Sequence, residues 1–234
     1  MTMRAGPSEL ARIFDAEVRA PGAFEELGPR YNVAPTQPVT VVLQRDDGRF
    51  IELHRWGLVP AWAKSPAVGA RMINARAETV ATSSAFRASF LRRRCVIPAD
   101  GFYEWRREGK ARKPFLIHAP SDEPLAFAGL WAPWRDPASG EWLLSAAVVT
   151  TAANTTVGQL HNRMPAILSA DEWPPLWLDP MIADPGLLSD LLHPADDDLL
   201  RIDAVSARVN NANNEGPDLL VATQEAAPAL TLFG

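Results

Sequence analysis

The sequence of 234 residues is poor in cysteine and lacks any long apolar run. The single cysteine, Cys95, excludes an internal disulfide and a cysteine-rich metal site. A membrane-spanning helix needs about 20 predominantly apolar residues, and the chain has neither such a run nor the apolar core of a signal peptide. We therefore expect a cytoplasmic protein that makes no contact with a membrane. Glycine is also sparse, at 14 residues against 21 prolines, and proline is depleted from helices and central strands. This balance predicts many turns and irregular loops.

Hydrophobic residues make up 47% of the chain, which is typical of a globular protein. Strand-like runs occur at 39–45, 50–56, 95–98, 102–107, 114–118, 125–131, 142–151 and 199–209, with turns at 46–48 and 136–140. Helices are predicted at 8–16, with Ser8 as N-cap, within 75–92, from Ser169 and at 184–193. Residues 20–38 read as a rigid extended loop. We predict one α+β domain over 1–234, with a strongly bent or barrel-like mixed β-sheet, several short flanking helices and a disordered tail from about residue 221.

Charge is distributed unevenly, although the net charge is −5. Residues 71–113 contain eleven basic and four acidic residues, a net charge of +7, whereas residues 171–203 have a net charge of −8. This asymmetry favours a basic face for a polyanion and an acidic, solvated opposite side. A pair of ordinary solvated faces is the alternative interpretation.

Glu104 stands in a strand-like run between aromatic residues. Phe102 and Arg106 share its face of the strand, while Tyr103 and Trp105 point to the other. A carboxylate among large aromatic side chains loses hydration, which raises its pKa and suits a general acid or base. The alternative is an ion pair at the edge of a strand.

Three further polar residues are candidates for a site. His161 has an imidazole that titrates near neutrality and can pass protons, although a structural histidine is the alternative. Asn74 can donate and accept hydrogen bonds at once, and Arg76 suits a phosphate contact. An N-cap asparagine beside a solvated arginine explains this pair equally well. We predict that Glu104, Asn74 and His161 converge on one site.

The remaining candidates are aromatic residues and the thiol. Trp56, Trp62, Trp105 and Tyr31 could stack on bases, although aromatic side chains more often belong to the core. Cys95 lies in an apolar strand, where a thiol behaves as a small hydrophobe with a raised pKa. We therefore interpret Cys95 as structural. The four histidines lack other ligands at metal spacing, so we predict no metal site and no cofactor.

Several motifs occur in one order along the chain and together resemble the SRAP family, the SOS-response-associated peptidases. The resemblance covers about residue 2 to about residue 220. The motifs are Tyr31-Asn-Val-Ala-Pro-Thr-Gln, Trp56-Gly-Leu-Val-Pro, Asn74-Ala-Arg-Ala-Glu-Thr, Arg93-Arg-Cys-Val-Ile-Pro-Ala-Asp-Gly-Phe-Tyr-Glu-Trp, Ala128-Gly-Leu-Trp and His161-Asn-Arg-Met-Pro.

The resemblance implies an enzyme that processes abasic sites in single-stranded DNA. In the family, the amine and thiol of an N-terminal Cys condense with the sugar aldehyde to form a thiazolidine DNA–protein crosslink. The positions that match the family's site are Asn74, Glu104 and His161. We expect Glu104 to transfer protons during Schiff-base formation and His161 to donate to the sugar oxygen. The residues expected to contact DNA are Arg76, Arg163, Trp105, Pro35 and Trp62.

The sequence departs from the family at its first residues. The family begins with Met-Cys-Gly-Arg-Phe-Thr, whereas this sequence begins with Met1-Thr2, and Thr2 takes the position of that Thr. We expect the reading frame to start further upstream and to supply the missing Cys. Asn162 stands where the family often has Asp. A non-covalent module that binds single-stranded or junction DNA is the alternative function, and a peptidase limited to its own N-terminus is a third. We expect a monomer.

Overall fold

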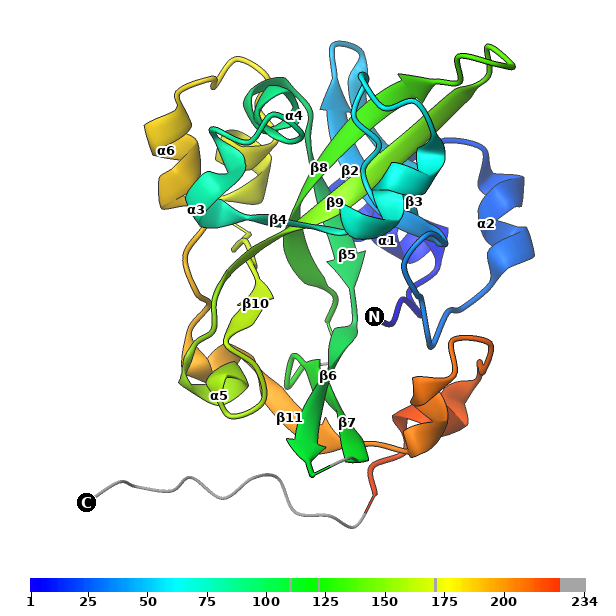
Figure 1. Ribbon diagram of the computed structural model, residues 1–234, viewed down its shortest axis with the longest axis vertical. Helices are drawn as coiled ribbons and strands as arrows, with labels where there is room; N and C mark the ends of the chain where they lie inside the picture. Colours follow the sequence, from blue (N-terminus) through cyan, green and yellow to red (C-terminus); the bar gives the residue numbers. More distant parts are fainter. Residues whose placement is uncertain (110, 122, 171, 224–234) are drawn as a thin grey trace.

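Five strands close into a barrel in the computed structural model, which describes residues 1–109, 111–121, 123–170 and 172–223 (Figure 1). The order around the barrel is β3–β2–β5–β8–β9, and a parallel pairing of β9 with β3 completes the ring. The other neighbours in the ring are antiparallel. The strands are β2 (Pro38–Arg45), β3 (Gly48–Trp56), β5 (Arg94–Ala99), β8 (Leu125–Arg135) and β9 (Trp142–Ala152). The predicted barrel-like mixed sheet is therefore confirmed.

Six further strands extend this framework. β1 (Glu17–Val18) pairs with β3, while β4 (Asn74–Arg76) and β10 (Arg163–Pro165) both pair with β9. A separate antiparallel sheet has the order β11–β7–β6 and lies below the barrel in Figure 1. Its strands are β6 (Gly101–Glu108), β7 (Ala111–His118) and β11 (Arg201–Ala204). The chain bends at Asp100 to pass from the barrel into this sheet, so β5 and β6 belong to two different sheets.

The barrel interior is identified by a contact between strands that are not neighbours. The rings of His54 on β3 and Trp131 on β8 lie 5.7 Å apart in an edge-on arrangement. Both rings therefore point into the barrel. Because side chains alternate along a strand, every second residue on these strands also points inward. Cys95 and Phe127 belong to this inner set and are buried. The interior also holds an acid–base pair, since Glu52 Oε2 lies 3.1 Å from His54 Nε2.

Short helices cover the outer face of the barrel. Phe14 of α1, Phe90 of α4 and Leu188 of α6 pack there against outward-facing apolar residues such as Val96. The α-helices are α1 (Pro7–Phe14), α2 (Pro21–Leu27), α3 (Ala77–Val80), α4 (Arg87–Arg92), α5 (Thr155–Gly158) and α6 (Pro185–Asp190). The other helical turns are η1 (Pro66–Arg71), the π-helical η2 (Trp173–Trp177), η3 (Asp197–Leu199), η4 (Ala207–Asn210) and η5 (Pro217–Leu220). Among the residues described, no helix is long and apolar enough to cross a membrane.

Most predicted strands and the helices within 75–92 are confirmed, but three local predictions are wrong. Gly6, not Ser8, is the N-cap of α1, because Pro7 takes the first helical position. The predicted loop at 20–38 contains helix α2, which Pro21 starts in the same way. The predicted strand at 199–209 is ordered as β11 only to Ala204 and continues as a 3₁₀ turn. The predicted tail lies outside the described residues from 224 onward.

Candidate functional site

A pocket of about 560 Å³ opens where the end of the barrel meets the small sheet. Its walls come from the first residue, loop 32–35, the ends of the barrel strands, β4, β6, the segment 161–165 and the turn 209–212. The lining includes seven of the predicted site residues, which are Pro35, Asn74, Arg76, Glu104, Trp105, His161 and Arg163. The structure thus brings Glu104, Asn74 and His161 together, while their catalytic roles stay predictions.

Glu104 contributes a largely desolvated carboxyl group to the pocket. It lies on β6 opposite Phe115 of β7, and its side chain is 25% exposed. Burial raises the pKa of Glu104, and the nearby His161 and the Met1 amine offset part of this rise. A carboxyl group in such surroundings exchanges protons closer to neutral pH than a solvated one.

His161 faces Glu104 from the loop between α5 and β10. Its Nδ1 atom lies 3.9 Å from Glu104 Oε1, and its side chain is half exposed. The backbone N–H of Arg163 lies 3.1 Å from the same Nδ1 atom. The Arg163 carbonyl oxygen lies 3.2 Å from Nδ1 as well. A ring with its proton on Nε2 accepts from the amide, whereas a ring with its proton on Nδ1 donates to the carbonyl.

Asn74 and Arg76 lie on β4, which pairs in parallel with β9 beside the pocket. Both side chains are exposed on one face of the strand, whereas Ala75 between them is completely buried. The alternative of an N-cap asparagine is wrong, because Asn74 lies in a strand and α3 begins only after Arg76. The strand therefore presents an amide and a guanidinium together at the pocket.

Arg163 lines the pocket but is already bound within the protein. Its guanidinium forms two hydrogen bonds with the Glu78 carboxylate, one of them Nη2 to Oε2 at 2.9 Å, and also donates to the Thr150 carbonyl. Arg163 holds the pKa of Glu78 below its usual range. Sequence reasoning missed Glu78, although it belongs to the motif that begins at Asn74.

The aromatic and proline candidates lie in different places. Trp105 lines the pocket, and its Nε1 donates to Asn210 Oδ1 at 2.6 Å. Pro35 lines the opposite wall. Trp62 is 59% exposed but does not line this pocket. Its expected contact with DNA stays a prediction.

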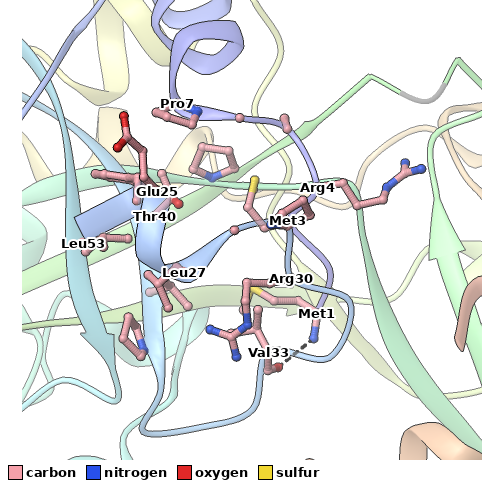
Figure 2. A pocket seen from close by; sticks show the side chains of 18 residues that line it. Met1, Met3, Arg4, Pro7, Glu25, Leu27, Arg30, Val33, Thr40 and Leu53 are labelled. Atoms are coloured by element: carbon pink, nitrogen blue, oxygen red, sulfur yellow. Dashed lines mark hydrogen bonds between the residues drawn. The ribbon is translucent and has the colours of Figure 1, made fainter. Parts of the chain in front are cut away.

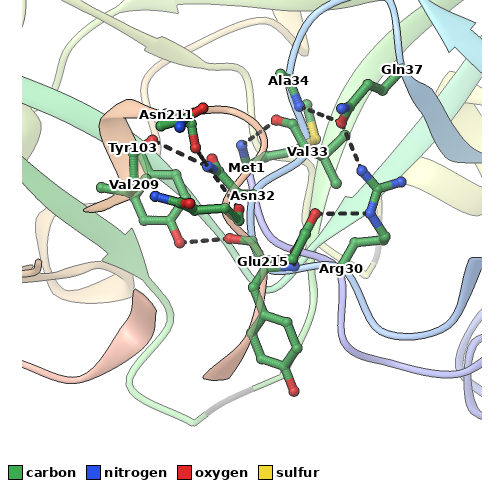
Figure 3. Close-up of polar contacts among 12 residues, drawn as sticks. Met1, Arg30, Asn32, Val33, Ala34, Gln37, Tyr103, Val209, Asn211 and Glu215 are labelled. Atoms are coloured by element: carbon green, nitrogen blue, oxygen red, sulfur yellow. Dashed lines mark hydrogen bonds and ion pairs between the residues drawn. The ribbon is translucent and has the colours of Figure 1, made fainter. Parts of the chain in front are cut away.

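Loop 30–37 is fastened to the C-terminal part of the chain by polar contacts that sequence reasoning missed (Figure 3). The amide of Asn32 donates to the carbonyls of Val209, Asn211 and Asn214. The carboxylate of Glu215 accepts from the Tyr31 amide at 2.7 Å and from Arg30 Nε at 3.0 Å. Asn32 lies in a motif noted in the sequence, whereas no local pattern singles out Glu215. These contacts fix one wall of the pocket.

Met1 occupies the floor of the pocket. Its amine donates to the Val33 carbonyl at 3.0 Å, and the Val33 amide donates back to the Met1 carbonyl. Burial lowers the pKa of this amine to about 5. Thr2 forms a bridge with Gly101 at the start of β6, so the first residues are held beside Glu104. On the other side of this segment lies a smaller, mostly apolar cavity of about 180 Å³ (Figure 2).

Cys95 lies in the barrel wall and does not line the pocket. The side chain is completely buried on β5, and burial raises the pKa of its thiol. It faces the barrel interior rather than the pocket, as the sequence predicted for a structural residue. No three His, Cys, Asp or Glu side chains lie close enough to hold a metal ion in the part of the chain that the structure describes.

Comparison with known proteins identifies the family to which this pocket belongs. The profile of a family described as SOS response associated peptidase (SRAP) matches residues 1–212. The chain belongs to the SRAP family. Abasic site processing protein YoqW of Bacillus subtilis is 41% identical over 196 residues, covering 83% of this chain and 87% of that protein.

More distant proteins are also similar to this chain. Abasic site processing protein HMCES of Xenopus tropicalis is 32% identical over 242 residues, covering 90% of this chain and 72% of that protein. A crystal structure of a Bacteroides thetaiotaomicron protein matches with a TM-score of 0.85 at 23% identity, over 95% of this chain and 98% of that one. This last similarity supports the fold alone.

Proposed function

We propose that this chain processes abasic sites in single-stranded DNA and that the pocket of about 560 Å³ receives the baseless sugar. The observation that carries the proposal is the convergence of Asn74, Glu104 and His161, from three distant segments, beside a buried amine. A ring-opened abasic sugar carries an aldehyde, and an aldehyde condenses with an amine through steps that need proton transfer. The names of the two relatives given above agree with this substrate.

The polar residues fit the successive steps of such a condensation. Attack of a neutral amine on the aldehyde carbon gives a carbinolamine, which loses water to leave an imine. Glu104, with its raised pKa, can donate the proton with which the hydroxyl leaves as water. His161 carries a ring proton for the sugar oxygen on the same side of the pocket, and Asn74 can hold the sugar hydroxyl or the attacking group.

The rim of the pocket suits the strand on either side of the lesion. Arg76 is exposed and supplies a positive charge for a phosphate, and Arg163 presents a guanidinium fixed by Glu78. Trp105, with its N–H already bonded to Asn210, offers its ring face to a base. An abasic nucleotide leaves a gap in the stack, so the flanking bases need such a platform.

The covalent part of the proposal concerns a chain that carries Met-Cys-Gly-Arg ahead of Met1. After removal of the initiator, its first residue has both an amine and a thiol. The thiol sulfur adds to the imine carbon while the imine nitrogen takes up a proton, which closes a thiazolidine without an external oxidant or reductant. The position of Met1 on the pocket floor places such an extension within a few residues of Glu104.

The test uses a single-stranded oligonucleotide with one abasic site and three forms of the protein. These begin at Met1, at Met-Cys-Gly-Arg-Met1, and at Met-Ser-Gly-Arg-Met1 as the matched control. On a denaturing gel we expect a stable shifted band only for the Cys form. The Ser form and the Met1 form should shift only after reduction of an imine with borohydride. Absence of a band in the Cys form contradicts the proposal.

A non-covalent DNA-binding module is the second candidate. The exposed Arg76 and the fixed ring of Trp105 favour it, because neither needs a nucleophile to hold a strand. It predicts salt-dependent binding of single strands by all three forms and no shifted band in any of them. A peptidase has less support, since the thiol of Cys95 is buried away from the pocket.

A further inference from the structure

One ion pair joins two of the segments that bring polar residues to the pocket. β4, which carries Asn74, and β10, which follows His161, pair with β9 along its two opposite edges. The guanidinium of Arg163 in β10 reaches across β9, contacts Thr150 on the way, and binds the Glu78 carboxylate at the start of α3. Glu78 and Arg163 therefore fasten the two walls of the pocket together.

Arg163 also determines how the imidazole of His161 is held. The backbone N–H of Arg163 donates to His161 Nδ1 at 3.1 Å, while the histidine side chain is otherwise half exposed in a short loop. β10 is only three residues long, so the guanidinium contacts of Arg163 add to the few backbone pairs with β9 that hold this group in place. A shift of Arg163 would thus change both the orientation of the His161 ring and its 3.9 Å separation from Glu104.

We propose that Glu78 is a positioning residue, which acts through Arg163 to hold the His161 ring in one orientation facing Glu104. The inference rests on the proposed function for its catalytic consequence. The geometry suits this task, since a carboxylate that binds a guanidinium through two hydrogen bonds fixes the plane of the group. An exposed ion pair adds only about 0–1 kcal/mol to stability, so the main effect of Glu78 falls on the site rather than on folding.

The first test needs no DNA and follows the imidazole of His161 by nitrogen-15 NMR at neutral pH. In the wild type we expect one set of ring nitrogen shifts, because the Arg163 backbone holds Nδ1. In Glu78→Ala we expect these shifts to change, and in Glu78→Gln, which keeps one acceptor, a smaller change. Glu108→Gln is the matched control, because Glu108 also pairs with an arginine, Arg106, but does not line the pocket, and it should give the wild-type spectrum. A wild-type spectrum in Glu78→Ala overturns the proposal.

The second test is a double-mutant cycle on the rate of abasic-site processing by the Cys-extended chain. Glu78→Ala should slow the reaction about 10- to 100-fold, as small displacements of catalytic groups do, and should change its pH profile. In the Arg163→Ala background the same change should add nothing, because its route to His161 is already lost. If the double mutant were slowed by the product of the two single-mutant factors, the proposal would be overturned. A wild-type chain that leaves abasic DNA unchanged, with the NMR result as expected, would contradict the proposed function alone.

Discussion

At the scale of single residues, the pocket contains two ionisable groups whose pKa values differ from those in water. The Glu104 carboxyl is buried with a raised pKa, and the Met1 amine is buried with a lowered one. Each shift moves the group toward its neutral form, because burial penalises charge. Imine formation needs a proton donor and a neutral amine, and the two shifts act in these directions.

The raised pKa of Glu104 has a measurable effect on stability. In the unfolded chain the carboxyl ionises near pH 4.3, whereas in the folded protein ionisation is delayed, so the wild type loses stability as the pH rises above that value. We expect Glu104→Gln to be more stable than the wild type at pH 7, by about 1 kcal/mol or roughly 2–4 °C in Tm, with no difference below pH 4. Thermal unfolding at the two pH values measures this.

Glu108→Gln provides the control with the opposite sign. Lys113 and Arg106 lower the pKa of Glu108, so removing its charge should not stabilise the protein at pH 7. A Glu104→Gln variant with a lower Tm than the wild type at pH 7 would contradict the argument that burial of the charged carboxyl costs stability. Its processing of abasic DNA should nevertheless be weaker, because the amide cannot supply a proton.

The burial of single residues was predictable from sequence where the pattern of apolar and aromatic residues along a strand determines it. The aromatic neighbours of Glu104 and the apolar strand around Cys95 gave their burial correctly. Glu78 was missed because its partner Arg163 lies 85 residues away, and no local pattern indicates such an ion pair. Glu215, whose partner Arg30 is 185 residues distant, was missed for the same reason.

At the scale of elements, one buried arginine fastens the helices that cover the barrel. Arg94 is 5% exposed, and its guanidinium donates only to backbone carbonyls in the contacts that the structure gives it. These carbonyls belong to Phe90, Leu91, Trp177, Asp179 and Ile182. Arg94 therefore does not contribute its charge to the surface. The prediction that the basic residues of segment 71–113 form a face for a polyanion does not hold for this residue.

Replacing Arg94 should destabilise the fold strongly. Arg94→Met leaves buried carbonyl groups without donors, and we expect a loss of about 3–5 kcal/mol in the free energy of unfolding measured with urea. Arg92→Met, at the exposed last position of α4 just before β5, should stay within about 0.5 kcal/mol of the wild type. A loss below about 1 kcal/mol for Arg94→Met would show that the carbonyls find other partners.

Elements were predicted well where periodicity was strong and poorly where proline dominated. The hairpin of β2 and β3 follows from alternation around a two-residue turn that Gly48 completes with a φ of 146°. Helix α2 was missed because Pro21 was taken as a mark of extended chain, although proline also favours the first position of a helix. Barrel closure rests on a two-residue pairing of β3 with β9, which no sequence pattern specifies.

At the scale of the whole molecule, the pocket should bind DNA through few charges, since the chain is acidic overall. Arg76→Ala should weaken binding of a single strand and lower the slope of log K against log salt by about 0.7, the value for one phosphate contact. Arg12→Ala, exposed on α1 away from the pocket, should change neither. Trp62→Ala tests the remaining predicted contact, and unchanged affinity would remove Trp62 from the interface.

The intact mass of the Cys-extended chain, after incubation with a single-stranded oligonucleotide bearing one abasic site, tests the central claim most directly. Condensation of an aldehyde with an amine and a thiol releases one water. We therefore expect a product with the summed mass of protein and oligonucleotide less one water, absent from the Ser-extended control and reduced in Glu104→Gln. Recovery of the unmodified protein, or an equal yield of adduct from the Ser form, would contradict the proposed chemistry of the pocket.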